Sequence, residues 1–375
     1  MSFKLIVALL FTCGAAFAQE NNYLLIGTYT EKSEGIYVYN FNTDNAENSK
    51  VSVVKADNPS YLAVSPNQKM VYAVAEKAEV TKQGTGGDVA SYAFNAATGT
   101  LTEINKRFSY GKHPCYVAID NTGKWVFEGN YSSGSLAVFP INANGSLDSV
   151  SQVIQHTGGG PNKARQERPH VHSTIVSPDN KYLFVQDLGL DKVFIYKFDN
   201  ITGQLTPGKQ PFVSTAPGSG PRHLTFHPNS KYAYLIEEMS ADVVAYKYKK
   251  GKLKVIQTLH LLPADFKGAL GSADIHVSPD GKFLYCSNRG DANDITILKI
   301  NEKNGTLTIV GHQSTMGKTP RNFTLDPTGN FLLVANQETD NVVIFKVDKE
   351  TGLLTDTGKS INVSKPVCLK WIKKD

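Results

Sequence analysis

Short stretches of alternating apolar and polar residues, separated by turn residues, recur along the whole of this 375-residue chain. The stretch from Pro221 to Glu238, PRHLTFHPNSKYAYLIEE, is the clearest example. It predicts a strand (RHLTF), a turn (HPNSK) and a second strand (YAYLI) that ends in two carboxylates. Few windows show the 3.6-residue period of an amphipathic helix, so the pattern favours an all-β protein.

Variants of this stretch begin at intervals of about 50 residues, and a fixed period of this length indicates a repeat architecture. The complete copies open at Pro59, Pro114, Val171, Pro221, Ser272 and Pro320, and a truncated copy starts at Lys365. Each complete unit contains about four short strands and a glycine turn, such as TGTL at 98–101 or NGTL at 304–307. Such units are typical of the blades of a β-propeller.

The two ends of the chain complete the count of blades. Residues 23–55 supply three further strands, and Val367–Ile372 supplies one. Together they make a seventh blade, which closes the ring by pairing the chain ends and removes exposed edge strands. We therefore predict a seven-bladed β-propeller with four antiparallel strands per blade.

The first residues of the chain have a different character. Lys4 precedes an apolar run from Leu5 to Ala18, which ends in the sequence AFA, an A-x-A cleavage site. This run is too short for a permanent membrane helix and is typical of a secretory signal peptide. We expect residues 1–18 to be removed, residues 19–375 to form a single domain, and the protein to be exported to a bacterial periplasm. No later apolar run is long enough to span a membrane.

Composition narrows the possible partners. The net charge is +5, with 19% charged residues and scattered lysines, which gives little support for a nucleic-acid surface. Cys115, Cys286 and Cys368 follow the signal peptide and lie in or beside predicted strands. An odd number of cysteines at wide spacing indicates neither a disulfide framework nor a metal site, so we expect buried free thiols. No cofactor is predicted.

The register of the repeats predicts where a functional site lies. In each unit the innermost strand begins where the next strand ends, so both positions lie at the same mouth of the central channel. Aligning the repeats places His172 and Arg222 at the first position, and Glu238 and Arg289 at the second. Arginine can bind an anion or stabilise an oxyanion, and histidine or glutamate can transfer protons. The four residues are a candidate catalytic set; the alternative is a group of solvated salt bridges.

A neighbouring aligned position is rich in oxygen-bearing side chains. It carries Asn130, Asp187, Asn288 and Asn336, which are the kinds of residue that bind divalent cations. We expect these residues instead to hydrogen-bond neighbouring loops, and no metal site is predicted.

Four segments carry a resemblance to a known family. They are RPHVHS (168–173), GPRHLTFHP (220–228), YLIEEMS (234–240) and HVSPDGKFLYCSNRGDAND (276–294). With its repeated TGxL turns, the chain from 22 to 372 resembles the seven-bladed lactonase propellers. That family includes 6-phosphogluconolactonases and carboxy-muconate lactonizing enzymes.

The resemblance implies roles for particular residues. The catalytic residues it implies are His172, Arg222, Glu238 and Arg289. His170 is an alternative to His172 as the catalytic histidine, and Glu237 is an alternative to Glu238 as the catalytic glutamate. The candidate substrate-binding residues are His170, Glu237, Arg321 and Asn288.

The resemblance also implies the hydrolysis of a sugar-acid lactone, with a small-molecule lactone as the partner. Because the chain carries an export signal, a non-phosphorylated lactone is easier to reconcile with it than a phosphorylated cytoplasmic sugar. Two alternatives stay open: a muconate-type cycloisomerase from the same family, and a non-enzymatic binding scaffold, which would show apolar patches on one face. The sequence is compatible with a monomer or a dimer.

Overall fold

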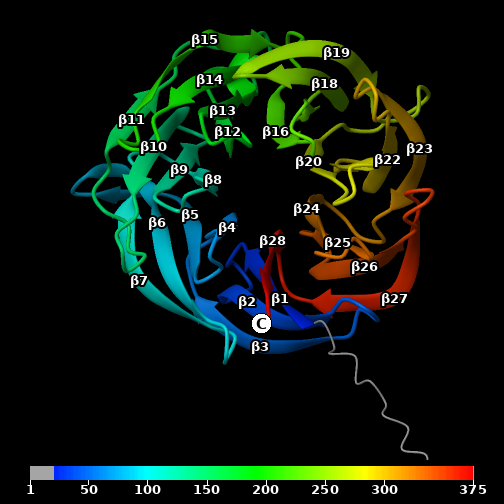
Figure 1. Ribbon diagram of the computed structural model, residues 1–375, viewed down its shortest axis with the longest axis horizontal. Helices are drawn as coiled ribbons and strands as arrows, with labels where there is room; N and C mark the ends of the chain where they lie inside the picture. The colour runs from blue at the N-terminus through cyan, green and yellow to red at the C-terminus, as the bar shows by residue number, and fades with distance from the viewer. Residues whose placement is uncertain (1–20, 375) are drawn as a thin grey trace, which may run out of the picture.

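Seven four-stranded antiparallel sheets surround a central axis in the computed structural model, which describes residues 21–374 (Figure 1). One sheet combines both ends of the chain, in the order β28 (Pro366–Lys373), β1 (Asn21–Thr28), β2 (Gly35–Asn42) and β3 (Asn48–Lys55). The predicted seven-bladed propeller is therefore confirmed, including the blade that both ends share.

The other six sheets follow one another along the chain, and each begins with the strand nearest the axis. The second and third blades contain β4 (Leu62–Val64), β5 (Met70–Thr81), β6 (Gly84–Asn95), β7 (Thr100–Phe108), β8 (Pro114–Ile119), β9 (Trp125–Asn130), β10 (Ser135–Pro140) and β11 (Gln152–Gln155). The fourth and fifth contain β12 (Val171–Val176), β13 (Tyr182–Asp187), β14 (Lys192–Phe198), β15 (Leu205–Ser214), β16 (Pro221–Phe226), β17 (Tyr232–Glu237), β18 (Asp242–Lys249) and β19 (Lys252–His260), with the 3₁₀ turn η1 (Leu188–Leu190) after β13. The sixth and seventh contain β20 (Ser272–Val277), β21 (Phe283–Asn288), β22 (Asp294–Ile300), β23 (Leu307–Ser314), β24 (Pro320–Leu325), β25 (Phe331–Asn336), β26 (Asn341–Val347) and β27 (Leu354–Asn362).

Hydrogen bonds between the two chain ends close the ring. Leu24 of β1 pairs with Trp371 of β28, and the ladder extends over nearly the whole of both strands (Figure 1). The indole Nε1 of Trp371 also donates to the carbonyl oxygen of Leu325 in the neighbouring blade, at 2.9 Å. β28 is thus held to its own blade along one edge and to the neighbouring blade by a side chain.

The second strand of a blade is buried more completely than strict alternation predicts. Every residue of β9, β17, β21 and β25 is buried. Neighbouring blades cover both faces of these strands, so that, for example, Phe283 and Tyr285 pack in one cluster with Phe323 and Phe345 of the next blade. A strand covered on both faces becomes a continuous apolar run.

The repeated glycine turns have a structural role between blades. Gly352 has a φ of +76°, and a Cβ added there would lie 2.4 Å from the ring of Phe283. Its carbonyl oxygen accepts a hydrogen bond from the hydroxyl of Tyr285, at 2.9 Å, and Tyr72 donates to Gly145 in the same way at 3.0 Å. Both the left-handed backbone and the close approach require glycine.

The second blade carries a longer hairpin than the short strands of the repeat pattern predict. β5 continues to Thr81 and β6 begins at Gly84, so both strands extend beyond their buried residues. Lys77 holds this extension by ion pairs with Glu79 at 3.0 Å and with Asp88 at 3.4 Å. Because polar residues stabilise the extension, it lacks the apolar alternation from which strands are predicted.

Cys115, Cys286 and Cys368 are free and buried, as the sequence predicts. Across residues 21–374 we find no helix with the length and apolar character needed to cross a bilayer. The predicted signal peptide, residues 1–18, lies outside the described residues.

Candidate active site

β-Bulges near the start of the innermost strands turn two consecutive side chains toward the channel. In β16 the pairing passes directly from Pro221 to His223, so that Arg222 is the extra residue. The same irregularity in β12 makes His172 the extra residue, and similar shifts occur in β8, β20 and β24. Because a bulge re-aims side chains, Arg222 and His223 line the same pocket.

This pocket lies at the channel axis and has a volume of about 10 Å³, which is room for roughly one water molecule. In most blades, the residue that follows the first residue of the repeat lines this pocket. These residues are Ser60, Cys115, His172, Arg222, Arg321 and Val367. The aligned position that the sequence analysis singled out therefore forms a ring around one space.

Glu238 joins three arginines from different parts of the chain. Its carboxylate oxygens lie 2.6 Å from Nη2 of Arg165, 3.0 Å from Nε of Arg222 and 3.0 Å from Nη2 of Arg289. The Glu238 side chain is only 8% exposed, and that of Arg222 only 2%. A buried carboxylate is therefore shared by several guanidinium groups that would otherwise repel one another.

These charges fix the ionisation of the cluster. Burial by itself would raise the pKa of the Glu238 carboxyl, but the charges of Arg289, Arg222 and Arg165 hold that pKa well below its ordinary value. Burial, together with the neighbouring guanidinium groups, lowers the pKa of Arg222 to about 10. At neutral pH Glu238 is thus an anion and Arg222 a cation.

His172 lies beside this cluster as a neutral imidazole. Its Nε2 is 4.0 Å from Oε2 of Glu238, and its buried Nδ1 has no hydrogen-bond partner among the described residues. Burial, and then the charges of Arg222 and its neighbours, lower the pKa of His172 well below its ordinary value. A neutral imidazole next to a carboxylate can accept a proton, because the carboxylate then stabilises the imidazolium.

Arg165 reaches the cluster from the loop between β11 and β12, and the sequence analysis did not identify it. Gln166 anchors the loop by donating to the carbonyl oxygen of Leu188 and to Asp191, at 2.9 and 2.7 Å. The glycine-rich segment 158–161 precedes Arg165 in this loop.

Two aromatic rings line the same side of the mouth. His170 stacks on Tyr131 with ring centroids 4.5 Å apart, and its Nε2 lies 3.3 Å from Oε2 of Glu167. Tyr131 also meets the ring of His172 edge-on at 5.6 Å. The structure thus places His170 one ring away from His172, next to the cluster and not within it.

Arg321 occupies the opposite part of the ring. Its guanidinium lies over the ring of Tyr29, 5.6 Å from the centroid, and the Tyr29 hydroxyl donates to Glu76 at 2.8 Å. Although burial opposes it, the charges of Tyr29 and Glu76 raise the pKa of Arg321 above its ordinary value. Arg321 therefore adds a further fixed positive charge to the pocket that His172 and Arg222 line.

Comparisons with known proteins agree with this architecture. The family model described as "Lactonase, 7-bladed beta-propeller" matches residues 23–371. This chain belongs to the seven-bladed lactonase propeller family. It is 40% identical over 352 residues to the 6-phosphogluconolactonase of Bacillus subtilis, covering 92% of this chain and 97% of that protein. It is also 40% identical to the 6-phosphogluconolactonase of Formosa agariphila, covering 88% of this chain and 94% of the relative.

A solved structure of a related protein has the same fold. The periplasmic gluconolactonase of Pseudomonas aeruginosa superposes on this lactonase propeller with a TM-score of 0.89 at 38% identity, covering 95% of this chain and 100% of that chain. The family resemblance stated from the sequence is therefore confirmed.

Two candidate residues of this lactonase propeller make their contacts away from Glu238. Glu237 accepts a hydrogen bond from Ser219 at 3.0 Å, and burial raises the pKa of its carboxyl to about 7. Asn288 donates to Asp294 at 2.7 Å and to Thr296 at 2.9 Å. Glu237 thus bonds to the segment that precedes β16, and Asn288 bonds to side chains of the adjacent strand β22.

The other polar strand ends behave similarly. Asn130 donates to the carbonyl oxygen of Ser109 at 3.1 Å, and Asn336 to that of Thr315 at 3.0 Å. Asn130 and Asn336 thus hydrogen-bond neighbouring loops as predicted, whereas Asn288 bonds to side chains of the adjacent strand β22. In the part of the chain that the structure describes, no group of three or more His, Cys, Asp or Glu residues is arranged to hold a metal ion.

Proposed function

We propose that this protein is an exported lactonase that hydrolyses a sugar-acid lactone, with an activity like that of 6-phosphogluconolactonase. The observation that carries the proposal is the cluster of Arg222, Arg289 and Arg165 around Glu238, with neutral His172 beside it. Hydrolysis of a lactone needs a group that accepts a proton from water and cations that stabilise the oxyanion. The cluster offers both at one mouth of the channel.

In the proposed mechanism, the guanidinium groups of Arg222 and Arg289 bind the lactone carbonyl oxygen. His172 accepts a proton from water at Nε2 while the water oxygen bonds to the carbonyl carbon. The tetrahedral oxyanion collapses, the bond from the carbonyl carbon to the ring oxygen breaks, and His172 returns the proton to that oxygen. The product is the open hydroxy acid. Glu238 stabilises the imidazolium and holds the arginines together.

Positive charge at the mouth favours a substrate with an anionic substituent. Arg165, whose side chain is 45% exposed, lies outermost in the cluster and is suited to bind a phosphate or carboxylate that enters from solvent. Two observations support export: the A-x-A site at residues 16–18, and the similarity to a protein that is described as a periplasmic gluconolactonase. Mass spectrometry of the protein from a periplasmic fraction tests export, because cleavage leaves a chain that begins at residue 19.

The activity is tested by NMR on purified protein of residues 19–375, with glucono-δ-lactone and, separately, its 6-phosphate. The ring-opening rate is measured against the rate without protein, both with and without a chelator. We expect acceleration that the chelator leaves unchanged, and the ratio of the two rates reports whether the phosphate is recognised. No acceleration of either lactone would contradict the proposal and leave the muconate-type reaction to be assayed next.

A matched pair of arginine variants locates the reaction. Removing a donor to a developing oxyanion lowers kcat by about 10²–10³-fold, and we expect this of Arg222→Ala. Arg168→Ala is the control, because the Arg168 side chain is 60% exposed and, among the described residues, its ion pair is with Glu167 at 2.8 Å. Equal activity of the two variants would show that the reaction takes place elsewhere.

A further inference from the structure

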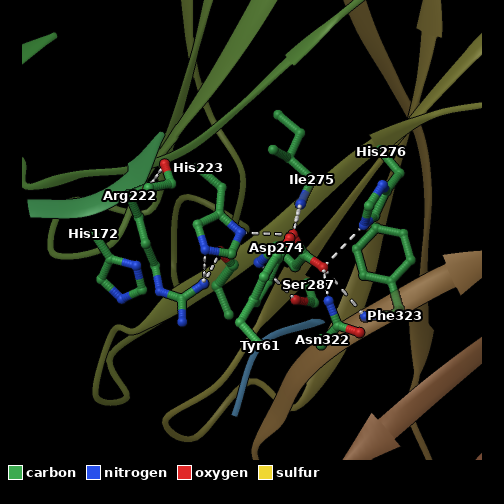
Figure 2. A network of polar contacts seen from close by, with 12 residues as sticks. Tyr61, His172, Arg222, His223, Asp274, Ile275, His276, Ser287, Asn322 and Phe323 are labelled. Carbon is green, nitrogen blue, oxygen red and sulfur yellow. Dashed lines mark hydrogen bonds and ion pairs between the residues drawn. The ribbon is translucent and has the colours of Figure 1, made fainter. Parts of the chain in front are cut away.

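A second layer of polar residues lies behind Arg222, on the side away from Glu238. Nη1 of Arg222 donates to the carbonyl oxygen of Ala273 at 2.5 Å and lies 3.3 Å from Nε2 of His223 (Figure 2). With Nε on Glu238, the guanidinium is held along two edges. Among the described residues, Nη2 has no hydrogen-bond partner, which leaves this nitrogen for a substrate oxygen.

The contact between Arg222 and His223 requires one tautomer of the imidazole. A guanidinium can only donate, so Nε2 of His223 must carry a lone pair. The proton of the neutral ring then lies on Nδ1, which faces Oδ1 of Asp274 at 2.8 Å. Burial, together with the charge of Arg222, lowers the pKa of His223 to about 4, which keeps the ring neutral.

Asp274 is itself fixed by several donors. Oδ1 also accepts from the backbone N–H of Ile275 at 3.0 Å, and Oδ2 accepts from Nε2 of His276 at 2.9 Å and from Nδ2 of Asn322 at 2.5 Å (Figure 2). The carboxylate is 2% exposed. A carboxylate with donors on both oxygens cannot rotate, so it fixes the plane and the tautomer of His223.

Aromatic rings restrict the remaining freedom of His223. Tyr116 and Tyr61 stack on each other with centroids 4.0 Å apart, and both meet the imidazole edge-on, at 5.3 and 5.9 Å. His172 also meets this ring edge-on, at 5.2 Å. The imidazole is therefore packed against the channel tyrosines and against the residue that takes the proton in the proposed mechanism.

We propose that Asp274 and His223 are positioning residues, which orient the guanidinium of Arg222 for oxyanion stabilisation by fixing a lone pair at His223 Nε2. This inference rests on the proposed function, and it extends the site from the rim into the channel. Neither residue contacts the substrate. Their effect is to hold Arg222 with Nη2 unoccupied, instead of letting its guanidinium rotate toward other acceptors.

Two substitutions of His223 separate positioning from a purely structural role. In His223→Gln, the amide oxygen takes the place of Nε2 and keeps an acceptor for Arg222. In His223→Asn, the amide nitrogen takes the place of Nδ1 and keeps the bond to Asp274, but Arg222 loses its acceptor. Misplacing a catalytic group by about 1 Å can lower a rate by about 10²-fold, so we expect a 10- to 100-fold lower kcat for Asn, an unchanged KM, and near-normal kcat for Gln.

The outcomes distinguish this proposal from the proposed function. If wild-type protein opens no lactone, or Arg222→Ala retains full activity, the proposed function fails. If Arg222→Ala is inactive while the Asn and Gln variants of His223 have equal kcat, the positioning role is refuted and the proposed function stands.

A measurement on unmodified protein covers the case in which a variant does not fold. Imidazole ¹⁵N shifts of wild-type protein at neutral pH report the tautomer of each histidine, and specific isotope labelling assigns the signal of His223. A neutral ring with its proton on Nδ1 supports the proposal. A proton on Nε2 overturns it, since that nitrogen could not accept from Arg222.

Discussion

Replacing Glu238 by glutamine tests whether its carboxylate holds the arginine cluster together. The substitution keeps the shape of the side chain and removes the negative charge that Arg222, Arg289 and Arg165 share. Breaking a buried ion pair by neutralising one partner costs about 3–5 kcal/mol. Most of this arises at Arg222 and Arg289, because Arg165 is half exposed and its pair with Glu238 is screened by solvent.

Thermal unfolding measures this effect. For a domain of this size, a loss of 3–5 kcal/mol lowers Tm by about 4–7 °C. Inorganic phosphate should restore part of the loss, because an anion that binds only the folded state raises its stability. We expect phosphate to raise the Tm of Glu238→Gln more than that of the wild type.

Glu167→Gln is the matched control. Glu167 pairs with Arg168 and lies near His170, but its side chain is 41% exposed, so its loss should change the stability by well under 1 kcal/mol. If Glu238→Gln unfolds at the wild-type temperature, or at a higher one, the carboxylate does not offset the repulsion among the arginines, and the electrostatic account of the site is wrong.

Four further predictions follow from the same structure. His172→Gln should lower kcat by about 10²–10⁴-fold with little change in KM, as steady-state kinetics would show; a change confined to KM would contradict its role as the base. Arg165→Ala should raise KM for a phosphorylated lactone and leave KM for the neutral lactone unchanged; equal effects would exclude recognition of the anion. His223 has a pKa of about 4 in the folded chain and about 6.5 when unfolded, so the unfolded chain takes up the proton first as the pH falls. Urea unfolding should therefore show about 3 kcal/mol of stability present at pH 7 and lost between pH 6.5 and 4, and His223→Gln should lack this component. Deleting residues 366–375 removes β28 and should yield aggregated or unfolded protein; a soluble monomer with native circular dichroism would show that ring closure is dispensable.

Much of this architecture can be predicted from the sequence because each blade repeats the same local pattern. The shared first blade follows from counting strands at the two ends, and β28 pairs with β1 as expected. The repeat register also places His172, Arg222, Glu238 and Arg289 at one mouth, and the structure brings these four side chains together. A repeat carries this information because equivalent residues in equivalent blades occupy equivalent positions around the axis.

The structural features that could not be predicted from the sequence are those that depart from the repeat. Arg165 comes from a loop outside the repeated segment. The contacts of Gln166 set the position of this loop, and they cannot be predicted from the repeat period. Strict alternation would send Arg222 and His223 to opposite faces of β16, whereas the bulge brings both to the channel. The extension of β5 and β6 cannot be predicted from apolar alternation, because ion pairs of Lys77 hold it instead of apolar contacts.

The bulges also bear on how such a protein could acquire new substrates. The extra residue in an innermost strand is left out of the strand pairing, and in most blades its side chain lines the pocket. A library restricted to Ser60 and Val367 would alter the interior of the pocket, because both residues line it and neither belongs to the apolar clusters between blades. Chemical diversity and folding stability are carried by separate positions of the same strand, so selection can act on one without disturbing the other.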